Sequence, residues 1–95
     1  MPVKLSWDEA KRQAALDERG LDFSLVVELF EGFHFTVEDT RKDYGERRFV
    51  SSGHIAGRLC FAVWTPRGNK RHVISLRKAN DREQKRYKIA LEQGR

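Results

Sequence analysis

The stretch RLCFAVWTPRGNKRHVISLRKANDREQKRY, residues 58–87, decides the fold of this chain. Residues 58–65 are apolar on both faces of an extended chain, which predicts a strand at the centre of a sheet. The tetrapeptide PRGN at 66–69 is a strong turn signal, because Pro66 presets its φ and Gly68 tolerates a positive φ. Residues 70–77 then return as an antiparallel strand. The stretch therefore begins with the two strands of a hairpin.

A capped helix follows this hairpin. Asn80 is placed as the N-cap, and Glu83 three residues later completes a capping-box pattern. Tyr87, Ala90 and Leu91 can share one face of the helix. The end of the strand and the first two turns of the helix are expected to meet at one corner, which carries Arg77, Lys78, Arg82, Lys85 and Arg86.

Two helices are expected before the sheet. Ser6 with Glu9 matches a capping box at the start of the first helix, and Gly20 is its C-terminal stop. Asp22 is placed to cap a second, shorter helix, which Gly32 ends. The N-terminal third of the chain is thus predicted to be helical.

The remaining segments complete the sheet. Alternating apolar residues predict a strand at 33–37, the polar run 39–46 predicts a loop, and 47–53 predicts a strand followed by a turn at 54–57. The expected fold class is α+β: two N-terminal helices packed on a four-stranded antiparallel sheet, followed by a C-terminal helix. Residues 1–95 are expected to form a single domain.

The composition is that of a globular protein. Of the 95 residues, 39% are hydrophobic and 11% aromatic, which is too apolar for a disordered chain. The single cysteine, Cys60, lies in an apolar run and is expected to be a buried, reduced thiol. No apolar stretch approaches the roughly 20 residues that span a bilayer, and no signal-peptide pattern precedes the first helix. A cytoplasmic protein without membrane contact is expected.

The positive charge is concentrated near the C-terminus. Residues 1–70 contain 11 Lys/Arg and 11 Asp/Glu, whereas residues 71–95 contain 8 Lys/Arg and 3 Asp/Glu. The whole net charge of +5 therefore lies in the last quarter of the chain. A localised basic surface points to nucleic acid or to an acidic protein partner, and a solvated helix face is the competing interpretation.

Metal and cofactor sites are not predicted. The three histidines are scattered, no spacing resembles a set of metal ligands, and phosphate-binding glycine loops are absent from the sequence. The residue types left at the basic corner can cleave RNA without a metal. RNA supplies its own 2′-OH nucleophile, cations hold the charge of the phosphorane, and Glu, His or a perturbed Lys can accept the proton. Tyr87 is placed equally well to stack a base and to pack in the core.

Three segments together resemble a known family: WDEAK at 7–11, RRFVSSGHIAGRLCFAVWT at 47–65 and RGNKRHVISLRKANDREQKRYKIALE at 67–92. They are similar to the BrnT family of ribonuclease toxins of type II toxin–antitoxin systems, which are related in fold to RelE. The resemblance implies a RelE-like fold, metal-independent endoribonuclease activity and inhibition of translation. It also implies a BrnA-like antitoxin, which neutralises the toxin and brings the pair to operator DNA.

The resemblance also implies roles for individual residues. The positions that match the family pattern are Lys11, Arg47, Arg77, Lys78, Glu83, Arg86 and Tyr87. Arg77 and Arg86 are expected to hold the scissile phosphate and Tyr87 to stack or position the RNA. Glu83 is a candidate proton acceptor, with orientation of an arginine and helix capping as alternatives. Further RNA contacts are expected from Lys11, Arg47, Lys78 and, on the basic helix, Arg82.

One position departs from the family pattern. Many members carry His-Gly where the first helix ends, and this chain has Arg19-Gly20. An arginine stays protonated and cannot replace a histidine base. Either that histidine is structural or the activity of this chain is altered. Two alternatives to a ribonuclease therefore stand, a nucleic-acid-binding module without catalysis and a basic corner that serves mainly to dock the antitoxin.

Overall fold

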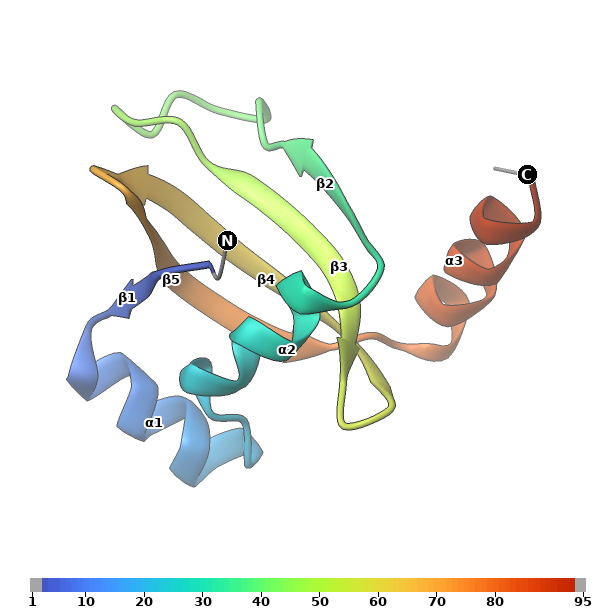
Figure 1. The fold of residues 1–95 in the computed structure, drawn as a ribbon, viewed down its shortest axis with the longest axis horizontal. Coiled ribbons are helices and arrows are strands. Elements are labelled where there is room, and N and C mark those ends of the chain that lie inside the picture. Colours follow the sequence, from blue (N-terminus) through green and yellow to red (C-terminus); the bar gives the residue numbers. More distant parts are fainter. Residues whose placement is uncertain (1–2, 94–95) are drawn as a thin grey trace.

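A computed structural model describes residues 3–93 of the chain. The elements in chain order are β1 (Leu5–Trp7), α1 (Glu9–Arg19), the 3-10 helix η1 (Phe23–Leu25), α2 (Val26–Glu31), β2 (His34–Glu38), β3 (Phe49–Ile55), β4 (Arg58–Arg67), β5 (Lys70–Lys78) and α3 (Asp81–Gln93). Figure 1 shows α2 in front of the sheet, α1 at the lower left and α3 apart from both at the right. The predicted α+β class is confirmed.

The strands form one five-stranded mixed sheet in the order β1-β5-β4-β3-β2. β4 is central, as its two apolar faces predict. The pairs β2–β3, β3–β4 and β4–β5 are antiparallel. The strands expected at 33–37 and 47–53 are present as β2 and β3, each displaced toward the C-terminus. The prediction of four antiparallel strands was wrong in detail, because Leu5–Trp7 adds a fifth strand that pairs in parallel with residues 71–73 of β5.

The predicted N-cap of the first helix was also wrong. Ser6 lies in β1, where its Oγ is 2.9 Å from Nδ1 of His72 on β5. Asp8 caps α1 instead, and its Oδ1 accepts the backbone N–H of Lys11 at 3.1 Å. Because Ser6 is engaged in the sheet, the next residue with a suitable side chain starts the helix. Gly20 is confirmed as the C-cap, with a left-handed φ of 68°.

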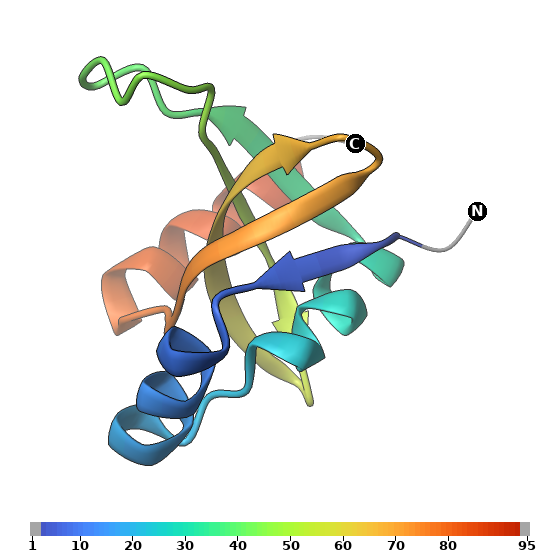
Figure 2. The same ribbon diagram turned by 90° about the vertical axis from the view of Figure 1, so that its left-hand side faces the viewer.

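The two faces of the sheet bury different cores. On one face α2 and η1 contribute Phe23, Val26 and Leu29 to the main core, together with Ala62 of β4. On the other face α3 packs through a small cluster of three buried residues: Leu59, Ala79 and Tyr87. In Figure 2 the sheet lies between α2 and α3. Neighbouring residues of β4 and β5 therefore point toward different helices.

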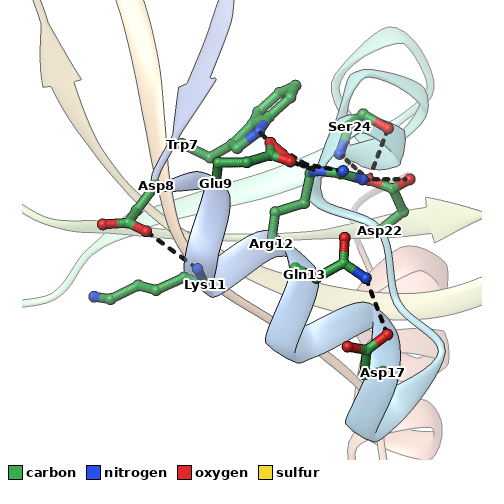
Figure 3. A network of polar contacts seen from close by, with 9 residues as sticks. All are labelled: Trp7, Asp8, Glu9, Lys11, Arg12, Gln13, Asp17, Asp22 and Ser24. Atoms are coloured by element: carbon green, nitrogen blue, oxygen red, sulfur yellow. Dashed lines mark hydrogen bonds and ion pairs between the residues drawn. The ribbon is translucent and has the colours of Figure 1, made fainter.

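Arg12 ties α1 to the connection that follows it (Figure 3). Its guanidinium lies 2.7 Å from Glu9 and 3.2 Å from Asp22. Asp22 also accepts the backbone N–H of Ser24 at 2.9 Å, which confirms it as the cap of the second helical segment. The side chain of Lys11 points away from this network (Figure 3). The position of α1, and with it that of Lys11, is thus fixed by half-buried and exposed polar contacts.

The turns between the strands are tighter than predicted. The β3–β4 turn consists of Ala56 and Gly57 alone, with φ values of 50° and 77°. Positive φ at both central residues is the signature of a type I′ hairpin turn. The β4–β5 turn consists of Gly68 and Asn69, and Pro66 lies within β4 rather than in the turn. Both hairpins therefore carry longer strands than the turn signals alone indicate.

Candidate functional site

α3 begins with a reciprocal cap at the end of β5. The Oδ1 atom of Asn80 accepts the backbone N–H of Glu83 at 2.8 Å, and the Oε1 atom of Glu83 accepts the backbone N–H of Asn80 at 3.0 Å. The predicted capping box is therefore confirmed. The cap also sets the direction of the Glu83 side chain, because it turns the carboxylate back toward the end of β5.

The carboxylate of Glu83 forms a two-pronged ion pair with Arg77. Nη1 of Arg77 donates to Oε1 at 2.8 Å, and Nη2 donates to Oε2 at 2.7 Å. The guanidinium also lies 4.7 Å from the ring centroid of Phe61 on β4. A fork-to-fork pair fixes the plane of the guanidinium, and the ring supports it from one side. Arg77 is thus held in one orientation on the α3 side of the sheet.

This pairing determines the protonation of Glu83. The hydrogen bonds from Arg77, and after them the backbone N–H of Asn80, lower the pKa of Glu83 to about 2. A carboxylate with so low a pKa is a weak proton acceptor at neutral pH. Of the three roles considered for Glu83, orientation of Arg77 and capping of α3 are the two for which contacts are present.

Two cavities adjoin on this face of the sheet and share Phe61. One, of about 280 Å³, lies between the sheet and α3 and is lined by Phe35, Ser52, Phe61, Glu83, Arg86, Tyr87 and Ala90. The other, of about 260 Å³, is lined by Arg41, Val50, Phe61, Val63, Ser75 and Arg77. The Arg77–Glu83 pair connects them, because each cavity includes one partner. The two cavities together are called the α3 groove below.

The α3 groove combines aromatic rings with guanidinium groups. The rings are those of Phe35, Phe61 and Tyr87, and the cations are Arg41, Arg77 and Arg86. Arg41 is partly neutralised by Asp39, whose Oδ1 lies 2.9 Å from its Nε. Aromatic faces that stack bases, next to cations that follow a phosphate backbone, are typical of sites for single-stranded nucleic acid.

Tyr87 belongs both to the core and to the groove. Its side chain is 9% exposed and contacts the rings of Phe35 and His54 edge-on, at centroid distances of 5.3 and 5.6 Å. Burial raises the pKa of its phenol. Within residues 3–93 the buried hydroxyl has no hydrogen-bond partner. Both interpretations from the sequence, core residue and ring beside the RNA site, fit this position.

The other predicted RNA contacts are dispersed. Lys11 lies in a cavity on the α1 side of β5 that shares Ser75 with the α3 groove. Lys78 follows Arg77 in the strand and lines a cavity on the opposite face. Arg47 is near the other end of the sheet, where it pairs with Glu38 at 3.1 Å. Arg82 is exposed on α3 but does not line the groove. The structure thus brings together Arg77, Glu83, Arg86 and Tyr87, whereas Lys11 lines a separate cavity.

Arg19 makes a structural contact. Its Nη1 donates to the carbonyl oxygen of Leu76 on β5 at 3.1 Å. β1 covers only residues 71–73 of that strand edge, so Arg19 satisfies a carbonyl beyond the reach of β1. Leu76 immediately precedes Arg77. Arg19 therefore supports the strand that carries Arg77.

Sequence reasoning missed several residues of the groove. Phe35 and Phe61 were assigned to strands but not to the site, although their spacing puts them on the face that α3 covers. Phe61 opposes Arg77 in the β4–β5 register, and this pairing can be read from the hairpin once its turn is known. Arg41 comes from the long β2–β3 loop, and no local signal predicts that it reaches the groove.

Comparison with known families gives a match. Residues 7–83, well over half of the chain, match the family described as "Ribonuclease toxin, BrnT, of type II toxin-antitoxin system". The chain belongs to this family. The BrnT match includes Arg77 and Glu83 but ends before Arg86 and Tyr87, so these two are connected to the site by their place in the α3 groove. A search of curated proteins found no match.

Membership in the BrnT family supports a ribonuclease toxin with a cognate antitoxin. In the part of the chain that the structure describes, no three His, Cys, Asp or Glu side chains gather as they would to hold a metal ion. No helix among these residues has the length and apolar character needed to cross a membrane.

Proposed function

We propose that this chain cleaves RNA at the α3 groove and that the cleavage inhibits translation. The observation that carries the proposal is the Arg77 guanidinium, held on Phe61 by the carboxylate of Glu83, between two cavities with aromatic walls. A single strand of RNA that crosses the groove places a phosphate near Arg77 and its bases near the rings.

The proposed reaction uses the nucleophile of the substrate. The 2′-oxygen of one nucleotide attacks the adjacent phosphorus, and the bond from phosphorus to the 5′-oxygen breaks. The 2′-OH gives up its proton to a base, and the departing 5′-oxygen takes up a proton, so a 2′,3′-cyclic phosphate and a 5′-OH result. Arg77 and Arg86 stabilise the extra negative charge of the phosphorane, which makes a metal ion unnecessary in this proposal.

The other groove residues have supporting roles in this proposal. Glu83 positions Arg77 rather than accepting the proton, because its pKa of about 2 makes it a poor base while the pair is closed. Tyr87 forms part of a wall against which a base can lie, since it lines the cavity between the sheet and α3. Lys11 lines a neighbouring cavity that shares Ser75 with the groove, and in this proposal it contacts the RNA backbone outside the groove.

A second candidate function is binding of RNA without cleavage. It is favoured by the same ion pair, which leaves the one carboxylate of the groove occupied. This module would bind single-stranded RNA in a strongly salt-dependent manner and release no products.

The two functions are separated by incubating the purified chain with a 5′-labelled single-stranded RNA. Cleavage is expected to give fragments that end in a 2′,3′-cyclic phosphate. Arg77→Ala and Arg86→Ala are expected to lower the cleavage rate by about 100-fold or more, because each removes a group that stabilises the transition state. The matched control is Arg67→Ala, an exposed arginine on β4 outside the groove.

The possible results of the cleavage experiment lead to different conclusions. Salt-sensitive binding of the RNA without any fragments would favour the second candidate. Wild-type rates in both Arg77→Ala and Arg86→Ala, with normal folding by circular dichroism, would show that the site lies elsewhere. In cells, the wild type is expected to arrest growth in the cytoplasm unless a BrnA-like antitoxin is co-expressed.

A further inference from the structure

A third cavity lies on the sheet face opposite the α3 groove. Its volume is about 350 Å³, and it is lined by residues from the end of α1, from η1, and from the adjacent ends of β3, β4 and β5. Its floor is made of buried aliphatic side chains, among them Leu21, Ile55 and Leu76. The exposed side chains around it are those of Leu25, Ala56, Arg58 and Lys78. It is called the hairpin cavity, because the β3–β4 turn forms one side of it.

The hairpin cavity differs in chemistry from the α3 groove. No aromatic side chain lines it, so it offers no ring on which a base can stack. An aliphatic floor of this size fits an apolar protein side chain. The contrast indicates a protein ligand for this cavity, whereas the aromatic groove on the other face suits RNA.

The charge around the hairpin cavity is positive. Arg58 and Lys78 form no ion pair within residues 3–93. The one carboxylate of the lining, Asp22, is already engaged by Arg12 at 3.2 Å and by the N–H of Ser24. The charged side chains of the lining that are left to meet a ligand are therefore cationic, and they complement carboxylates that flank an apolar anchor.

The turn beside the cavity carries a conformational cost. Ala56, with φ of 50°, is the one non-glycine residue with positive φ in the described part of the chain. Asparagine, aspartate or glycine is the usual choice there, and alanine costs about 1–2 kcal/mol. Strained positions are concentrated at binding sites. The methyl group of Ala56 keeps this side of the cavity apolar, where a side-chain amide would not.

We propose that the hairpin cavity is the docking site for an acidic segment of the cognate antitoxin, which inserts an aliphatic side chain and places carboxylates on Arg58 and Lys78. The inference rests on the toxin–antitoxin pairing of the family and not on cleavage of RNA. The segment binds on the face away from the α3 groove, so docking and substrate binding use different residues.

The docked segment also reaches the base of α3. Nη2 of Arg58 donates to the carbonyl oxygen of Ala79 at 2.6 Å, and Ala79 immediately precedes the cap residue Asn80. Lys78 is next to Arg77 in β5. A carboxylate on Arg58 therefore acts one hydrogen bond away from the joint that positions Glu83 and Arg77.

The test measures the affinity of the full chain for its antitoxin by titration calorimetry. Arg58→Glu and Leu25→Asp are each expected to weaken binding by about tenfold or more, since one reverses a complementary charge and the other puts a charge beside an apolar anchor. Two matched controls are expected to stay within about threefold of the wild type. Arg67→Glu reverses an arginine at the other end of β4, and Ile89→Asp charges an exposed aliphatic residue of α3.

Each result of this test either supports or overturns the docking proposal. Wild-type affinity in both Arg58→Glu and Leu25→Asp overturns the proposal, as do equal losses in the controls or the absence of any binding by the wild type. If Arg58→Glu fails to fold by circular dichroism, Leu25→Asp and the conservative Arg58→Lys carry the test. RNA cleavage by Leu25→Asp is expected to equal that of the wild type, because Leu25 lies outside the α3 groove. Failure of the ribonuclease proposal leaves the affinities unaffected, so the two ideas fail separately.

Discussion

Replacing Glu83 by glutamine tests the ion pair that organises the α3 groove. Glutamine at this position still caps α3, because Glu and Gln serve equally in a capping box. What the change removes is the negative charge and one of the two acceptors facing Arg77. The substitution thus separates the ion pair from the helix cap.

The magnitude follows from the pKa and the exposure of the pair. A pKa lowered from 4.5 to about 2 corresponds to about 3 kcal/mol of stability at neutral pH when nothing screens the interaction. The side chain of Arg77 is 52% exposed, however, and exposed pairs contribute only about 0.2–1 kcal/mol. We expect Glu83→Gln to lower the free energy of unfolding by about 1 kcal/mol. For a domain of this size, Tm falls by about 4–8 °C.

The sign of the pH dependence is fixed by the direction of the pKa shift. The folded state lowers the pKa of Glu83, so its contribution is complete above the ordinary value of 4.5 and is lost as the pH falls toward 2. Thermal unfolding followed by circular dichroism should show the full difference between wild type and Glu83→Gln at about pH 7 and a much smaller one at about pH 3. Glu92→Gln, on the same helix, is the control and should show neither effect.

Two results would refute this reasoning. An equal Tm of wild type and variant at neutral pH would mean that the pair contributes nothing. A loss of cleavage of about 1,000-fold or more, together with loss of the acid limb of the pH–rate profile, would mean that Glu83 is the proton acceptor after all. A positioning residue should instead lower the rate by about 100-fold or less and leave the shape of the profile unchanged.

Two further substitutions test single features of the fold. Tyr87→Phe removes a buried hydroxyl that has no hydrogen-bond partner within residues 3–93. It should raise the free energy of unfolding by about 1 kcal/mol in urea titrations. RNA cleavage should persist, because the ring remains, and a lower stability would reveal a hydrogen-bond partner for this hydroxyl. Ala56→Asn should also stabilise the fold, by about 1 kcal/mol, since asparagine tolerates a positive φ in a type I′ turn. If Ala56→Asn lowers Tm instead, the packing of the methyl group outweighs the strain of the turn.

Short-range sequence signals predicted the helix caps and stops that depend only on nearby residues. The cap at Asn80 and Glu83, the stop at Gly20 and the cap at Asp22 each depend on a few neighbouring residues, and all three are present. The central position of β4 followed from its two apolar faces. β1 could not be predicted in this way, because Leu5–Trp7 becomes a strand only through pairing with a segment more than sixty residues away.

The sequence pointed to residues of the candidate site but not to their three-dimensional arrangement. Arg77 and Lys78 are adjacent in the chain, and alternation along β5 sends them to opposite faces, so only Arg77 reaches the groove. The pairing of Arg77 with Glu83 required the relative placement of β5 and α3, which the capping pattern alone does not determine. The aromatic wall required the register between β2, β3 and β4.

The way α3 is attached has a further consequence. Three buried residues form its cluster with the sheet, whereas the main core lies on the other face. A helix held by so few apolar contacts is a separate cooperative unit, with a lower opening free energy than the strands beneath it. When it detaches, Glu83, Arg86 and Tyr87 leave the sheet together, while Arg77 stays on its strand. We therefore expect backbone amides of α3 to exchange with solvent before those of β4, through a state that keeps the sheet folded but takes the α3 groove apart.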